Sequence, residues 1–170
     1  MRGQRRQHGF SLVELIIVMA IIGVLTAVAT LGYRQLVRRA ESMDGYSQFS
    51  AVKTRIAAFY TAAGVLPADF SDLGLPGKSG EANGGDTGSY EDVFGLKSDV
   101  WTAVEYQPKP PHGYVFVLRS TEPLDIGLHF QIKPMAGGGI RVRCIVNAKP
   151  ERMAYVPAQC RDGGVDDWNW

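Results

Sequence analysis

Gly9-Phe10-Ser11-Leu12-Val13-Glu14 opens an apolar run that extends to Leu31, and this stretch decides how the rest of the chain is organised. Glu14 is the only charged residue between Leu12 and Leu31. As a helix, about 20 residues at ~1.5 Å each span the ~30 Å hydrocarbon core of a bilayer. The run therefore predicts a membrane anchor. Its carboxylate needs a partner, because a charge within a membrane-spanning helix costs at least ~2.5 kcal/mol.

The residues before the apolar run suggest where that partner comes from. Three arginines among the first six residues make a basic segment that the positive-inside rule places on the cytoplasmic side. Cleavage after Gly9 would give Phe10 a free amino group four residues before Glu14. In a medium of low dielectric constant, this amine would neutralise the carboxylate of its own chain or of a neighbouring subunit displaced along the helix axis.

The stretch from Gly9 to Leu25 closely resembles the class III signal and the first helix of type IV pilins and related pseudopilins. The resemblance implies cleavage after Gly9 by a prepilin peptidase, N-methylation of Phe10, and a role for Glu14 in filament assembly. Members of the family often have a helix-breaking proline where this chain has Leu31, so a bend at this point lacks its usual cause.

A continuous helix is predicted from about Phe10 to Ala63, with the membrane and filament anchor at residues 12–31. No proline occurs between Tyr33 and Ala63, and apolar residues recur every three or four positions, which indicates one helical face. That face comprises Leu36, Ala40, Met43, Phe49, Val52, Ile56, Phe59, Tyr60 and Ala63.

Other residues of this helix predict its surface and its end. Arg34, Arg38 and Arg39 lie off the apolar face, which indicates a surface toward solvent, lipid headgroups or another subunit. Gly45 is a weak point within the helical pattern. Gly64, followed by Pro67, marks the predicted end of the helix.

Residues 64–170 are predicted to form one globular head. Residues 64–112 match the αβ-loop of pilins in layout, with an exposed glycine-rich loop at 77–88 and a short strand at 100–106. Residues 113–147 are predicted to form a small antiparallel sheet, because three strand candidates there are joined by short turns. The candidates are Tyr114–Arg119, Ile126–Lys133 and Gly139–Asn147. One sheet face is expected to pack on the second half of the helix, which gives an α+β fold.

The composition fits an exported subunit with one globular domain. Loss of residues 1–9 removes three of the 18 basic side chains and none of the 17 acidic ones, so the balance becomes −2. This near-neutral charge argues against a general nucleic-acid surface, and nucleic acid stays a partner without support in the sequence. Cys144 and Cys160 lie beyond the anchor, and such a pair in an exported domain predicts one disulfide. Two free buried thiols in a cytosolic protein are the alternative.

The C-terminal segment adds a second point of resemblance. Residues 155–161, Tyr-Val-Pro-Ala-Gln-Cys-Arg, resemble the disulfide-bounded end of many major pilins, where the bridge pins the C-terminal segment to the last strand. This assigns residues 144–160 to a disulfide loop and 161–170 to a tail. The tail is predicted to be a solvated acidic segment, with Trp168 and Trp170 either packed or exposed. Calcium binding by Asp162, Asp166 and Asp167, as in some pseudopilins, is the alternative, although no EF-hand spacing occurs.

The remaining residues predict neither an enzyme nor a cofactor site. His112 and His129 are the only histidines after the leader, and neither has a cysteine or aspartate nearby at the spacing of zinc ligands. His129 falls on the predicted polar face of its strand. No serine nucleophile motif or paired carboxylates are recognisable, so a catalytic role is not expected.

The favoured function is a structural subunit of a type IV pilus, which polymerises with its own copies through the N-terminal helix. The resemblance implies processing by prepilin peptidase, contact with the inner-membrane assembly machinery, and a final location in the extracellular pilus. Cell adhesion and twitching motility are the cellular roles associated with such filaments. A minor pilin or a type II secretion pseudopilin is the alternative within this class.

A secreted binding protein is the alternative from another class. Ala27-Val28-Ala29 satisfies a signal peptidase I site, and cleavage there would make residues 1–29 an ordinary signal peptide. The mature chain would then begin at Thr30. Glu14 within the apolar region and the helical pattern that continues after Ala29 both argue against this interpretation.

Overall fold

The computed structural model describes residues 10–79, 85–109, 112–161 and 168. The chain divides into two compact units, Met1–Val37 and Arg38–Trp170. The predictions for Gly9, for Trp170 and for the three aspartates of the tail lie outside the described residues.

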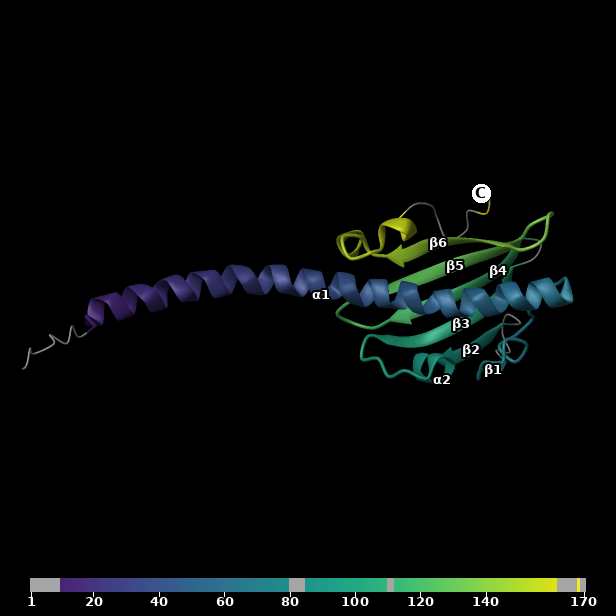
Figure 1. Ribbon diagram of the computed structural model, residues 1–170, viewed down its shortest axis with the longest axis horizontal. Helices are drawn as coiled ribbons and strands as arrows, with labels where there is room; N and C mark the ends of the chain where they lie inside the picture. The colour runs from purple at the N-terminus through teal and green to yellow at the C-terminus, as the bar shows by residue number, and fades with distance from the viewer. Residues whose placement is uncertain (1–9, 80–84, 110–111, 162–167, 169–170) are drawn as a thin grey trace, which may run out of the picture. The chain divides into compact units, whose positions relative to one another are not determined.

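Helix α1 (Leu12–Ala63) confirms the predicted long N-terminal helix (Figure 1). Its backbone remains helical through Leu31 and Gly32, so the position of the family's proline shows no break. The helix ends at Gly64, which has a left-handed φ of 73° and donates its N–H to the carbonyl of Tyr60 at 2.9 Å. This is the glycine-terminated helix end expected from the sequence.

The head contains an antiparallel sheet whose six described strands follow one another in chain order (Figure 1). The strands are β1 (Lys78–Ser79), β2 (Asp86–Ser89), β3 (Trp101–Lys109), β4 (Gly113–Ser120), β5 (Ile126–Pro134) and β6 (Ile140–Ala148). Strands β4, β5 and β6 confirm the three candidates to within one residue at each end, and the α+β class is confirmed.

Residues 64–112 contribute more of the sheet than their composition indicated. The loop predicted at 77–88 contains β1 and most of β2, and the strand predicted at 100–106 runs on to Lys109. Asp86 explains part of this difference, because its buried Oδ2 accepts the N–H of Phe70 at 2.6 Å and fixes the start of β2. Such long-range pairing is invisible in a short stretch of Asp, Thr, Gly and Ser.

The short helix α2 (Tyr90–Phe94) was not predicted, although its boundary signals are present in the sequence. Ser89 caps its start, because the Ser89 Oγ accepts the N–H of Asp92 at 3.0 Å. Gly95 ends it in the left-handed region at φ 70°. A serine followed three residues later by an acidic residue is a typical helix start.

The head's core lies between α1 and the sheet. The rings of Phe49 on α1 and Phe130 on β5 stack with centroids 3.8 Å apart, and Phe116 on β4 lies 5.3 Å from Phe49. Val52 and Ile56 continue the buried face of α1. This packing confirms the predicted contact between the helix and one face of the sheet.

The predicted apolar face of α1 is wrong in its N-terminal part. Met43 is 44% exposed, and the positions facing the head here are Ser42 and Gly45, both buried. A side chain at position 45 would clash with the indole of Trp101, which lies against Gly45. The indole Nε1–H of Trp101 donates to the carbonyl of Glu41 at 3.0 Å. The sequence pattern missed this contact because glycine and serine carry no apolar signal.

The outer face of the sheet is partly covered as well. Val115 and Val117 on β4 are buried beneath Trp168, and Gln131 on β5 is fully buried. The predicted polar face of β5 is therefore not a simple solvent surface. The outcome for Trp168 is also settled, because it packs on the sheet rather than standing exposed.

Gly45→Ala is expected to destabilise the head. An added Cβ at Gly45 would lie 2.3 Å from the Trp101 ring, and overpacking of this kind costs about 1–3 kcal/mol. This exceeds the ~1 kcal/mol that alanine gains over glycine in a helix. Thermal unfolding of the full chain in detergent measures the effect. Gly32→Ala, where nothing lies within 4 Å of the added Cβ, should leave the midpoint of the head unchanged. An unchanged midpoint for Gly45→Ala would contradict the Trp101 contact.

Two buried tyrosines predict a loss of stability at high pH. Burial raises the pKa of Tyr106, whose Oη donates to the carbonyl of Pro67 at 2.9 Å. Burial, together with the charge of Asp44, raises the pKa of Tyr90 to about 12. Above pH ~10 the unfolded chain loses phenolic protons that the folded chain retains, so stability falls as the pH rises toward 12.

Tyr90→Phe separates the two tyrosines in this prediction. The Tyr90 hydroxyl is buried without a hydrogen-bond partner among the described residues, so its removal should be neutral or stabilising at pH 7. The variant should also lose less stability between pH 10 and 12 in denaturant titrations. Tyr106→Phe should instead cost ~1–3 kcal/mol at pH 7, because it leaves the buried carbonyl of Pro67 unpaired. Equal alkaline slopes for Tyr90→Phe and the natural chain would refute the assignment.

Candidate processing and assembly site

The N-terminus of α1 is closed by a reciprocal pair of hydrogen bonds. Ser11 precedes the helix, and its Oγ accepts the N–H of Val13 at 3.2 Å. Glu14 reaches back, and its Oε2 accepts the N–H of Ser11 at 3.0 Å. This is a capping box, which satisfies two of the N–H groups that a helix start leaves unpaired. The Ser-x-x-Glu pattern was available in the sequence, but its local role was not predicted.

The capping box gives the Glu14 carboxylate a hydrogen-bond partner that was not expected from the sequence. In the uncleaved chain the nitrogen of Phe10 belongs to a peptide bond and carries no charge. Glu14 therefore has the Ser11 N–H as its partner before any processing. A free amine on Phe10 would be a second, charged partner, available only after cleavage.

The first part of α1 exposes its apolar side chains on every face. Thirteen large apolar side chains between Phe10 and Val28 are exposed, including Phe10 at 81%. Burial of each is worth ~1.5–3 kcal/mol, so their exposure to water would cost roughly 20–40 kcal/mol. That exceeds the ~5–15 kcal/mol stability of a typical domain. This surface therefore requires a cover other than water.

Length and composition allow α1 to cross a membrane. Among the described residues it is the single helix long and apolar enough to do this. None of its most apolar stretch is buried within the chain. Thr26 and Thr30 satisfy their hydroxyls inside the helix by donating to the carbonyls of Ile22 and Thr26. Internal pairing of this kind suits an apolar surrounding. A cleavable signal sequence would pass the same test of length and composition, so other observations must separate the two.

Comparison with known proteins provides one such observation. Residues 4–30 match the family model of the prokaryotic N-terminal methylation motif, which includes Gly9, Phe10 and Glu14. The chain is 38% identical over 69 residues to the fimbrial protein EcpC of Eikenella corrodens, an alignment that covers 41% of this chain and 45% of the relative. The resemblance to type IV pilins is confirmed.

Two further relatives are named as major type IV subunits. The type IV major pilin protein PilE of Neisseria gonorrhoeae is 34% identical over 73 residues, which cover 43% of this chain and 44% of the relative. The type IV major fimbrial protein FimA of Dichelobacter nodosus is 45% identical over 51 residues, 30% of this chain and 32% of the relative. The chain thus matches less than half the length of these curated pilins.

The predicted disulfide is present in the head. Cys144 on β6 and Cys160 form a bridge with a Cα–Cα distance of 4.6 Å and a sequence separation of 16. Both cysteines are buried. Closing a loop of this size stabilises a fold by ~3 kcal/mol in the chain-entropy model.

The disulfide loop docks on α1 through Ser42 and through two arginines that were expected to face solvent, lipid headgroups or another subunit. Arg38 donates from Nη1 to the Tyr155 hydroxyl at 3.1 Å, and its guanidinium lies 5.1 Å from the centroid of the Tyr155 ring. Arg39 donates from Nε to the carbonyl of Ala154 at 3.0 Å. The fully buried Ser42 donates its hydroxyl to the carbonyl of Tyr155. We call this set of contacts the loop clamp.

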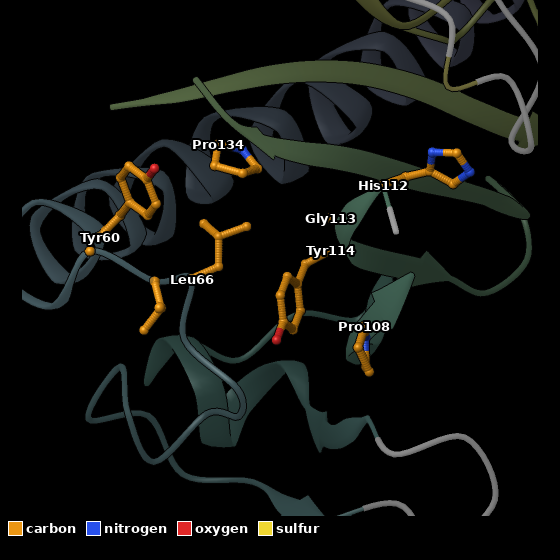
Figure 2. Close-up of a pocket in the computed structure, with 9 residues that line it drawn as sticks. Tyr60, Leu66, Pro108, His112, Gly113, Tyr114 and Pro134 are labelled. Atoms are coloured by element: carbon orange, nitrogen blue, oxygen red, sulfur yellow. The ribbon is translucent and has the colours of Figure 1, made fainter. Parts of the chain in front are cut away.

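A cavity with a volume of about 410 Å³ lies in the head beside the end of α1 (Figure 2). Figure 2 shows Tyr60, Leu66, Tyr114 and Pro134 around this space. Val65, Pro108, His112 and Gly113 are also among the lining residues. The lining is mainly apolar and aromatic, and no sequence prediction pointed to it.

The two histidines are not brought together by the fold. His112 stacks on the indole of Trp168 with ring centroids 5.5 Å apart, and His129 lies within β5. Among the described residues no group of three histidine, cysteine or acidic side chains is placed to hold a metal ion.

The loop clamp predicts measurable coupling between Arg38 and Tyr155. Arg38→Ala should cost about 1–2 kcal/mol, because it removes a hydrogen bond and a cation–π contact. In a double-mutant cycle with Tyr155→Ala, the combined loss should be smaller than the sum of the single losses. Arg34→Ala, an exposed arginine one turn earlier on the same helix, should change stability by less than ~0.5 kcal/mol. Additive losses would show that the two side chains do not interact in solution.

Proposed function

We propose that this protein is a structural subunit of a type IV pilus and that it polymerises through the first part of α1. The observation that carries the proposal is the apolar surface from Phe10 to Val28, which is exposed on every face and has Glu14 as its only charged residue. A lipid bilayer covers such a surface before assembly, and the same segments of neighbouring subunits cover it afterwards. The methylation motif and the pilin relatives support this assignment.

Processing is the step that makes assembly possible in this proposal. A prepilin peptidase removes residues 1–9 and leaves an amine on Phe10, which is then methylated. The Glu14 carboxylate exchanges the neutral Ser11 N–H for this positive charge, on its own subunit or on a neighbour. Within an apolar filament core, a buried charge without its partner costs ~3–5 kcal/mol. Subunits docked in the wrong register are thereby disfavoured.

The proposed domain organisation follows from this path. Residues 12–31 of the precursor lie in the inner membrane, where the assembly machinery is also located. Residues 64–170 form the head outside the membrane. The mature subunit ends in the extracellular fimbrium, as a structural protein without enzymatic activity. Two relatives named as major pilins favour a major subunit over a minor pilin or a pseudopilin.

Variants of Glu14 and Ser11 test the proposal. Glu14→Gln retains a capping-box side chain but removes the negative charge, so precursor folding and cleavage should continue. Filament yield should fall to a tenth or less, because an unpaired buried amine costs at least ~3 kcal/mol and ~1.4 kcal/mol is a factor of ten. Electron microscopy of sheared filaments, with immunoblots of the processed subunit, provides the measurement.

Ser11→Ala is the matched control. It removes the cap, worth ~1 kcal/mol, but leaves the charge of Glu14, so filaments should persist. Normal filament numbers in Glu14→Gln would remove Glu14 from its proposed role. If the chain were instead secreted after cleavage at Ala29, neither substitution would be present in the mature product and neither would affect it.

A further inference from the structure

The cavity beside the end of α1 lies at one end of the sheet. Pro108 is near the end of β3, Tyr114 near the start of β4, and Pro134 at the end of β5. The strand pairing places all three at the same end of the sheet. The volume of about 410 Å³ falls within the ~300–1,000 Å³ typical of binding sites. Val65, at 61% exposure, stands on its wall. We call this cavity the socket.

The opposite end of the sheet carries an exposed leucine. Leu96 follows Gly95, the left-handed residue that ends α2, and it is 45% exposed. It precedes Trp101, which pairs with Ser120 at the end of the sheet away from the socket. Among the described residues of the head, the exposed large apolar side chains are Met43, Val65, Leu96 and Met135. Val65 lines the socket and Met135 follows Pro134, so Met43 and Leu96 are the exposed apolar side chains of this set toward the far end. Met43 lies on α1, whereas Leu96 lies in the segment between α2 and β3.

The charged side chains differ between the segment around Leu96 and the rim of the socket. Near Leu96 lie three carboxylates, on Glu91, Asp92 and Asp99, with one lysine, Lys97, which is within 3.7 Å of Glu91. The rim of the socket carries the exposed Lys109 at the end of β3 and the exposed imidazole of His112. The segment around Leu96 is therefore acidic, and the rim of the socket has a basic side chain. This arrangement favours contact between the Leu96 segment of one molecule and the socket rim of another.

We propose that Leu96 of one subunit inserts into the socket of the next subunit in the filament. The occupant of the socket is thus a second copy of this chain, and Asp99 of that copy faces Lys109. A contact between opposite ends of one molecule is heterologous, and a heterologous contact that does not close into a ring generates an open helical fibre. The inference rests on the proposed pilus function and adds a contact between heads to the packing of the N-terminal helices.

Cysteine cross-linking in assembled filaments tests this contact. The double variant Leu96→Cys/Val65→Cys should form, on mild oxidation, a ladder of covalent multimers longer than dimers on non-reducing gels. Each single variant can give at most dimers. The native Cys144–Cys160 bridge occupies the other two cysteines. Filaments that assemble normally but yield no ladder would overturn the socket contact while leaving the proposed pilus function intact. Absence of filaments from the natural chain would overturn the proposed function itself.

Met43→Cys/Val65→Cys is the matched control, because Met43 on α1 is exposed to 44%, almost the same as Leu96. It should give no ladder, and an equal ladder from this pair would show that cross-linking does not report the proposed contact. A second measurement uses Leu96→Asp, which should weaken association of subunits at least about tenfold, because it loses one buried leucine contact. Leu96→Met should retain association. Equal filament stability for both variants would contradict the insertion of Leu96.

Discussion

The apolar surface of α1 between Phe10 and Val28 is the constraint on which the rest of the molecule depends. The stability of a single domain cannot offset the hydration cost of so many exposed aliphatic side chains, so this surface requires an apolar cover. Glu14 makes the two ends of that surface different, because its carboxylate lies near the N-terminal end. There it accepts the N–H of Ser11. The same residue closes the start of the helix and, in the proposed function, offers its charge to the amine of a processed subunit.

The head holds the second half of α1 by two different means. Aromatic stacking of Phe49 on Phe130 fixes its centre, and the loop clamp fixes the turn from Arg38 to Ser42. The disulfide secures the clamp indirectly, because it ties the segment that carries Tyr155 to strand β6. A sheet and a covalent loop therefore act together on one helix.

The sequence predicts those parts of the molecule that depend on periodicity or on strong local signals. Helix α1, strands β4 to β6 and the disulfide follow from apolar spacing, β-branched runs and the location of the cysteines. Strands β1 and β2 do not, because polar and small residues there acquire their conformation by pairing with β3 and through the buried Asp86. The buried positions Gly45 and Ser42 were missed for a related reason. Gly45 makes room for the Trp101 ring, and Ser42 donates to the carbonyl of Tyr155, and both partners are distant in sequence.

Determination of the mature N-terminus by mass spectrometry of purified filaments tests the central claim most directly. The account predicts that the chain begins at an N-methylated Phe10 and retains the whole apolar segment. A soluble, non-polymerising product that begins at Thr30 would contradict it, because the surface that requires a cover would then be absent from the mature protein.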